Sequence, residues 1–191
     1  MAAGMSKRMG SPKMLLPFQG KTIIRHVIDH ALCSDLDGIV VVVNPAVEGL
    51  INEASETGVN KVILNSRAGE GLSTSVKSGL LFLPLKVEAA LFMLGDQPLI
   101  TNKEIDRLVH RFKKGRSAPI YQSSYLGNKG HPVIFQRSLF GDLYNVQGDE
   151  GGRALIKKYH HHVQLVEMGR RNPSDIDTRN DYEKLLDEEV S

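Results

Sequence analysis

Apolar positions along the first 114 residues follow two different periods in turn. Residues 21–34 carry apolar side chains at helical spacing, whereas residues 38–43 (GIVVVV) form a continuous β-branched run typical of a strand covered on both faces. A second uncharged run, AALFML, occupies residues 89–94. The other elements expected in this part are helices at 45–56, 73–83 and 101–114 and a strand at 61–64. This alternation predicts an α/β fold with a mostly parallel sheet.

The pattern changes after residue 115, where short strand-like pieces are separated by glycine and proline. The strands expected there are 117–121, a piece at 125, 131–135 and 162–168, and the helices are 136–145, 151–159 and 180–189. The sequence shows no internal repeat, low-complexity tract or linker. A single domain over residues 1–191, with a modified C-terminal third, therefore accounts for the whole chain.

Composition excludes several classes of protein. A net charge of +2, with basic residues spread along the chain, gives no case for nucleic acid or a membrane as a general partner. The single cysteine, Cys33, cannot form an internal disulfide, and we expect it to be a buried, inert thiol. With no apolar run of membrane-spanning length and no secretion signal, we expect a cytoplasmic protein.

The first loop, residues 2–13, has two glycines and three cations but no acidic side chain. Glycine allows several backbone N–H groups to approach one anion, and Arg8 and Lys13 supply the charge that a polyphosphate needs. The pattern predicts a nucleotide-phosphate loop. A disordered basic tail is the alternative.

Two further polar loops follow expected strands, at the sheet edge where open α/β folds bind ligands. Residues 65–75 offer Asn65, two glycines and three consecutive hydroxyls, which suit either a nucleotide-base pocket or a simple helix cap. Residues 95–98 (GDQP) place Asp96 after an uncharged strand. Such an aspartate can hold Mg²⁺ together with phosphate oxygens, or it can be an ordinary turn residue.

The last third of the chain carries more charged groups in glycine-rich loops. His131 and Arg153 stand in two of them, and Asp149 precedes an expected helix that it could cap. Residues 175–178 (DIDT) place two acids on one face of an expected short strand, which could complete a metal site or cap the last helix. The histidines at 160–162 are expected to be solvated rather than to bind metal.

Taken together, these motifs resemble a known family. They are AAGxSxRMGxxK at 2–13, Asn65 with GLSTS at 71–75, GDQP at 95–98, GHP at 130–132, GDxGxR at 148–153 and DIDT at 175–178. In these motifs the chain is similar to the MobA-like NTP transferases, which share the molybdopterin-guanylyltransferase fold. Within that family it resembles the cytidylyltransferase branch that serves xanthine dehydrogenase. The resemblance implies a three-layer, Rossmann-like (GT-A-like) nucleotidyltransferase domain, with nucleotide binding in 1–114 and acceptor binding in 115–191.

The resemblance implies Mg²⁺-dependent transfer of CMP from CTP to the terminal phosphate of molybdopterin, with release of pyrophosphate. The catalytic residues implied are Arg8, Lys13 and Asp96, and the acceptor-binding residues are His131 and Arg153. Asp96 and Asp177 would hold the metal, with Asp149 as the alternative to Asp177. The nucleotide-binding set implied is Ala2, Ala3, Gly4, Ser6, Arg8, Lys13, Asn65, Gly71, Ser73, Ser75 and Asp96. A molybdenum hydroxylase such as xanthine dehydrogenase is the implied partner.

Other activities fit the same motifs. A related enzyme could use GTP, or a sugar phosphate or methylerythritol phosphate as acceptor. The chain could instead carry molybdenum cofactor without turnover, or act as a regulatory nucleotide-binding module.

One departure from the family concerns the start of the sequence. In the family a hydrophobic strand leads into the first loop, and here Met1 stands where that strand ends. Either the chain begins further upstream, or a central position of the sheet is empty and the loop loses its anchor.

Overall fold

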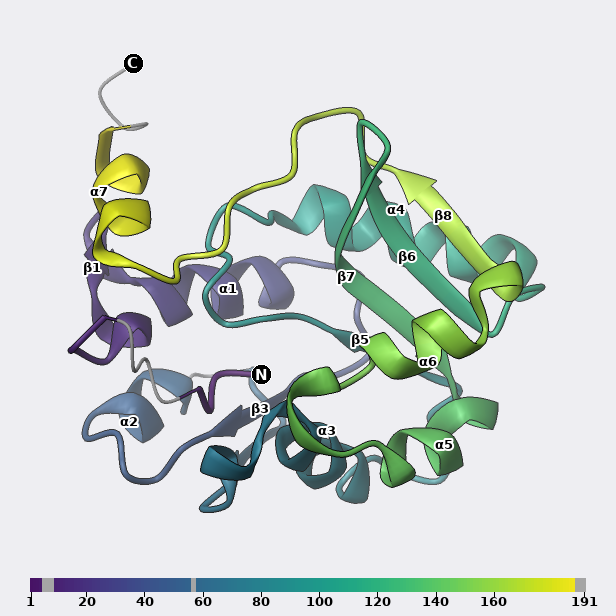
Figure 1. Cartoon of the computed structure of the whole chain (residues 1–191), viewed down its shortest axis with the longest axis horizontal. Coiled ribbons are helices and arrows are strands. Elements are labelled where there is room, and N and C mark those ends of the chain that lie inside the picture. The colour runs from purple at the N-terminus through teal and green to yellow at the C-terminus, as the bar shows by residue number, and fades with distance from the viewer. Residues whose placement is uncertain (5–8, 56–57, 188–191) are drawn as a thin grey trace.

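The structure is a computed structural model that describes residues 1–4, 9–55 and 58–187. Figure 1 shows an α/β fold in which helices cover both faces of a mixed sheet. The helices are α1 (Ile23–Leu32), α2 (Leu50–Ala54), α3 (Leu72–Leu81), α4 (Asn102–Gly115), α5 (Phe140–Asn145), α6 (Arg153–Lys158) and α7 (Arg179–Asp187). The strands are β1 (Pro17–Phe18), β2 (Lys21–Thr22), β3 (Val40–Val43), β4 (Lys61–Leu64), β5 (Ala89–Phe92), β6 (Ile120–Tyr125), β7 (Asn128–Gln136) and β8 (Val163–Glu167). The expected α/β class is thereby confirmed.

Side-chain alternation in the strands builds two apolar layers. Tyr121 of β6 points into a cluster with Leu108 and Phe112 of α4, on the side that α1 also covers. Its neighbour Ile120 points the opposite way, into a cluster with α3, α5 and α6 that includes Leu143. These five helices therefore bury their apolar faces against the sheet, as the three-layer arrangement requires.

The sheet is interrupted in its centre. β3 pairs with β4 in parallel, while β5, β7, β6 and β8 form a separate group in that order, with β5 antiparallel to β7. In the described part of the chain, β3 and β5 are not paired with each other, and a cavity of about 1020 Å³ is lined by residues of both.

The first loop nevertheless keeps an anchor at its start. The Ala2 N–H donates to the Val42 carbonyl at 2.8 Å, and the Gly95 N–H donates to the Met1 carbonyl at 2.9 Å. Met1 and Ala2 thus join the end of β3 to the segment after β5. Because Ala2 and Ala3 are also buried, the loop leaves the sheet from a fixed point, and the expected loss of its anchor is not observed.

Several local expectations were wrong. Cys33 is exposed, because it follows the last residue of α1 instead of lying on the buried face of that helix. The helix expected at 45–56 is reduced to α2, which begins only after Gly49, a residue with a left-handed φ of 81° that interrupts helical geometry. Residues 175–177 form a loop where a short strand was expected. Within the described ranges, no helix is long and apolar enough to cross a membrane.

Candidate active site

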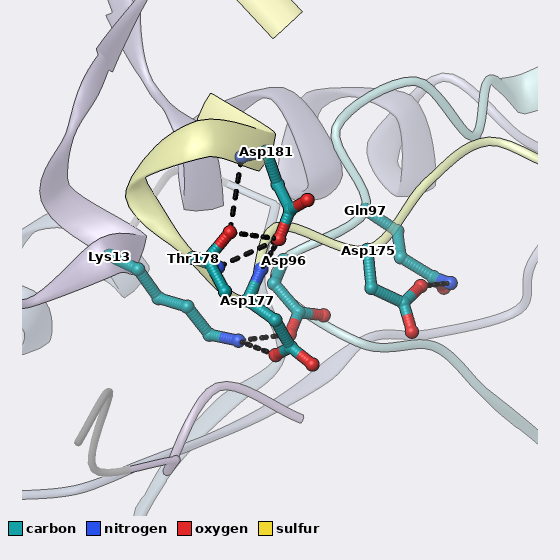
Figure 2. Close-up of polar contacts among 7 residues, drawn as sticks. All are labelled: Lys13, Asp96, Gln97, Asp175, Asp177, Thr178 and Asp181. Carbon is teal, nitrogen blue, oxygen red and sulfur yellow. Dashed lines mark hydrogen bonds and ion pairs between the residues drawn. The ribbon is translucent and has the colours of Figure 1, made fainter. Parts of the chain in front are cut away.

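Lys13 lies at the centre of a buried cluster of charged groups. It begins a short 3₁₀ turn (Lys13–Leu15) after the first loop, and only 7% of the residue is exposed. Its Nζ donates to Asp96 Oδ2 at 2.6 Å and to Asp177 Oδ1 at 3.0 Å (Figure 2). Three segments far apart in the sequence therefore converge on one ammonium group.

Burial and charge act in opposite directions on that ammonium. Burial disfavours its charged form, but the Asp96 and Asp177 carboxylates outweigh this effect and raise the pKa of Lys13 above its ordinary value. Lys13 is therefore charged at neutral pH. The cluster of one ammonium and two carboxylates carries a net negative charge as long as both acids are ionised.

Asp96 is fixed by the close packing of the residue before it. A Cβ at Gly95 would lie 3.0 Å from the Ala2 Cβ and from Ile24 Cδ1, so the backbone at Gly95 approaches the first loop more closely than a side chain allows. The Asp96 side chain is 13% exposed, and no donor from the described residues reaches its Oδ1. Among the described residues, that buried oxygen is therefore open to a bound ligand.

Asp177 reaches the same point because its loop is attached to the segment after β5. The Ile176 N–H donates to the Asp96 carbonyl at 3.3 Å, and Ile176 itself is buried. One residue earlier, the Gln97 Nε2 donates to Asp175 Oδ1 (Figure 2). Burial, followed by the nearby Asp96 and Asp177 charges, raises the pKa of Asp175 despite this hydrogen bond.

The other end of the loop is fixed by a capping box at the start of α7. Asp181 Oδ2 accepts from the Thr178 N–H at 2.8 Å, from Thr178 Oγ1 at 2.7 Å and from the Asp177 N–H at 3.2 Å. In return, the Asp181 N–H donates to Thr178 Oγ1 at 3.3 Å. Capping of the last helix was one of the two roles expected for residues 175–178, and the spacing T-x-x-D signals its form. The contact between Gln97 and Asp175 was not expected from the sequence.

The loop after β4 packs through its own hydrogen bonds. Asn65 is buried, and its Nδ2 donates to Thr74 Oγ1 at 2.9 Å and to Ser75 Oγ at 3.0 Å. Ser73 is buried as well. The proposed base-side residues thus lie together at the start of α3, where Asn65 holds the loop to the helix.

Gly71 brings this loop against the loop that contains Asp149. A Cβ at Gly71 would lie 2.4 Å from the carbonyl carbon of Gly148 and 2.8 Å from the Asp149 nitrogen, and its φ of 109° favours glycine. Asp149 therefore lies beside Gly71, whereas Asp177 contacts Lys13. Of the two acids considered as a second metal ligand, Asp177 is the one placed beside Asp96.

His131 lies close enough to Asp96 for the charge of that carboxylate to affect its pKa. Burial is the main cause that lowers its pKa to about 4, and the charges of Asp96, the terminal ammonium and Arg153 also act on it. The imidazole is therefore neutral at physiological pH. Arg153, at the start of α6, is exposed.

The remaining predicted residues belong to the first loop. Gly4 is exposed, and Ala2 uses its N–H for the bond to Val42. Ser6 and Arg8 lie outside the described residues. Of the predicted catalytic and metal-binding residues, the structure brings together Lys13, Asp96 and Asp177.

The cluster suits a divalent cation that a phosphate helps to hold. The described residues contain no group of three or more His, Cys, Asp and Glu side chains able to bind a metal by themselves. Mg²⁺ commonly takes one or two carboxylates and completes its shell with water and substrate phosphates. Two converging carboxylates, one with a buried oxygen that lacks a donor, match that requirement.

Comparison with known proteins decides the family. Residues 1–163 match the MobA-like NTP transferase domain. The chain belongs to this family. The MobA-like chain is similar to the nicotine blue oxidoreductase of Paenarthrobacter nicotinovorans, with 25% identity over 97% of this chain and 94% of the relative. It is also similar to the molybdenum cofactor cytidylyltransferase of Escherichia coli, with 28% identity over 95% of this chain and 90% of the relative.

Solved structures agree with this assignment. A homologue of Mycobacterium tuberculosis Rv0371c from Mycobacterium sp. strain JC1 superposes with a TM-score of 0.86 and 33% identity, covering 99% of this chain and 93% of the other. A manganese complex of Rv0371c itself has a TM-score of 0.80 and 26% identity, covering 97% and 94%. The MobA-like chain is therefore a nucleotidyltransferase of a family in which a related protein binds a divalent metal.

Proposed function

We propose that this nucleotidyltransferase transfers CMP from CTP to the terminal phosphate of molybdopterin. A phosphate oxygen of the acceptor forms a bond to the α-phosphorus, the bond from that phosphorus to the bridging oxygen breaks, and pyrophosphate leaves. The observation that carries the proposal is the convergence of Lys13, Asp96 and Asp177 on one point. The similarity to a molybdenum cofactor cytidylyltransferase supports the choice of substrates.

Each residue has a role that follows from its charge. Lys13 stabilises the negative charge that develops on the α-phosphate, because a fixed, buried cation loses little solvation at the moment of reaction. Asp96 and Asp177 hold Mg²⁺, which supplies charge neutralisation to the phosphates when bound. Backbone N–H groups near Gly4, together with Arg8, bind the triphosphate. No general base is needed, since the acceptor phosphate is already an anion.

The two ends of the substrate complex lie on different loops in this proposal. Ala3 and Ser6 contribute to binding the triphosphate as part of the first loop. The loop that begins with Asn65, whose side chain bonds to Ser75, binds the base. His131, neutral at physiological pH, and Arg153 face the acceptor, where Arg153 binds its phosphate. A molybdenum hydroxylase would receive the product.

A pyrophosphate-release assay tests this proposal. The full chain is incubated with Mg²⁺ and each of the four nucleotides, with and without molybdopterin. We expect release with CTP only, and only when molybdopterin is present. Release with GTP would assign a guanylyltransferase, and release with a sugar phosphate or methylerythritol phosphate as acceptor would assign another substrate. Retention of the cofactor without nucleotide consumption would favour a carrier and overturn the proposed transfer.

A further inference from the structure

We propose that Lys13 is an internal counter-ion that occupies the divalent-cation position between Asp96 and Asp177, so that the metal binds tightly only when a nucleotide phosphate draws the ammonium away. This inference rests on the proposed function for the identity of the metal site. It goes beyond that function because it gives Lys13 a second role, in coupling metal binding to nucleotide binding.

The geometry places the ammonium on the two oxygens through which Asp96 and Asp177 converge, so a metal that bridges those two oxygens must replace it. Lys13 Nζ lies 2.6 Å from Asp96 Oδ2 and 3.0 Å from Asp177 Oδ1. A Mg²⁺ ion bound to the same two oxygens would lie about 2.0–2.1 Å from each. Two cations cannot share that space between the same carboxylates, so one displaces the other (Figure 2).

Burial makes displacement by the metal alone unfavourable. Lys13 is 7% exposed, and a buried ammonium that leaves its carboxylates needs another anion. The charges give the same result. Asp96 and Asp177 together carry −2, whereas the ammonium and a divalent cation together carry +3, so the two cations repel each other at these carboxylates.

A triphosphate removes both obstacles. Its oxygens supply a new partner for Lys13 and additional ligands for the metal, and its negative charge balances the added cation. The nucleotide therefore increases metal affinity, and by linkage the metal increases nucleotide affinity by the same factor. The resting site is thereby protected from binding a divalent ion in the absence of substrate.

The test is Mn²⁺ binding measured by electron paramagnetic resonance and water-proton relaxation. The full chain is compared with the variants Lys13→Met, Lys13→Arg and Lys21→Met. Lys21→Met is the control, because it removes an ion pair of the same length, 2.6 Å to Asp29, that has no part in the proposed metal site. Without nucleotide we expect Lys13→Met to bind Mn²⁺ at least about ten-fold more tightly than wild type, while Lys13→Arg and Lys21→Met bind it as weakly. Circular dichroism checks that each variant is folded.

A second measurement needs no variant. In wild type, CTP should raise Mn²⁺ affinity at least about ten-fold after correction for Mn²⁺ held by the nucleotide in solution, and in Lys13→Met the increase should be smaller. Unchanged or weaker Mn²⁺ binding by Lys13→Met, or equal affinity with and without CTP in wild type, would overturn the inference. If wild type releases pyrophosphate but shows no such coupling, only the inference fails. If Lys13→Met binds Mn²⁺ tightly but no nucleotide is consumed by wild type, only the proposed function fails.

Discussion

Lys13 and Asp96 form a 2.6 Å ion pair although they lie 83 positions apart in the sequence. The pair joins the first loop to the segment after β5, and Asp177 joins it from the C-terminal segment. Because Lys13 and Asp96 are buried and charged, each depends on the other for compensation, whereas the Asp177 side chain is partly exposed. Substitutions here therefore separate chemical roles from structural ones only when stability is measured as well.

Asp96→Asn should lower the rate of CTP-dependent pyrophosphate release by about 100- to 1000-fold, the size of effect seen when one group that stabilises transition-state charge is removed. The amide keeps the size of the side chain but cannot hold Mg²⁺ as a carboxylate does. Steady-state assays at saturating Mg²⁺ measure the effect. Asp142→Asn is the matched control, because Asp142 pairs with Lys158 elsewhere on the surface. Full activity in Asp96→Asn would remove Asp96 from the metal site.

Asp181→Ala should loosen the loop that presents Asp177. The variant loses the acceptor for the Asp177 and Thr178 N–H groups, and we expect a stability loss of about 1 kcal/mol, as for other helix caps. The Mg²⁺ concentration for half-maximal activity should rise several-fold, with kcat at saturating Mg²⁺ nearly unchanged. Asp187→Ala, which removes an exposed acid from the end of the same helix, is the control. Equal Mg²⁺ requirements in both variants would show that the cap does not position Asp177.

Gly71→Ala should destabilise the protein by bringing two loops into conflict. The new Cβ would lie 2.4 Å from the Gly148 carbonyl carbon, in addition to the strain of a positive φ. Gly127→Ala is a matched control, because Gly127 has a φ of 84° but no atom within 4 Å of the added Cβ. Urea unfolding should show Gly71→Ala to be at least about 2 kcal/mol less stable than Gly127→Ala. Equal stabilities would mean that the contact between the loops contributes nothing.

His131 should make stability depend on pH in the acidic range. Its pKa falls from 6.5 in the unfolded chain to about 4 in the folded protein, so protonation favours unfolding. The stabilisation is fully present above pH 6.5 and is lost as the pH falls through about 4, with a total of about 3 kcal/mol. Unfolding free energies measured between pH 7 and 4 should fall less steeply in His131→Asn. Parallel curves for the two proteins would contradict burial of a neutral imidazole.

The fold was largely predictable from the sequence, because the spacing of apolar residues in the helices and the β-branched runs in the strands match the faces that are buried in the structure. Residues 61–64 were expected as a strand and form β4, and the helix expected at 101–114 is α4, which begins with a capping box between Thr101 and Glu104. The antiparallel placement of β7 beside β5 was not predictable, since apolar runs carry no information about strand direction.

The site was predictable only where topology rules apply. Loops after neighbouring strands meet at one edge of the sheet, which brings the first loop and Asp96 together. Asp177 follows no strand, and its position depends on a long-range backbone bond from Ile176 to Asp96 that no periodicity encodes. Asn65 illustrates the reverse case, because its motif suggested ligand contact, whereas the structure gives its side-chain amide three partners within the protein.

The break between β3 and β5 bears on how the domain opens. Within residues 1–4, 9–55 and 58–187, the facing edges of β3 and β5 do not pair with each other across the cavity, whereas β6 lies between β7 and β8. Exchange with deuterium should therefore be fast along the two facing edges and slow in β6. The backbone hydrogen bonds of Met1 and Ala2 connect β3 to the segment after β5. The strength of these bonds therefore determines how cooperatively the two groups of strands unfold.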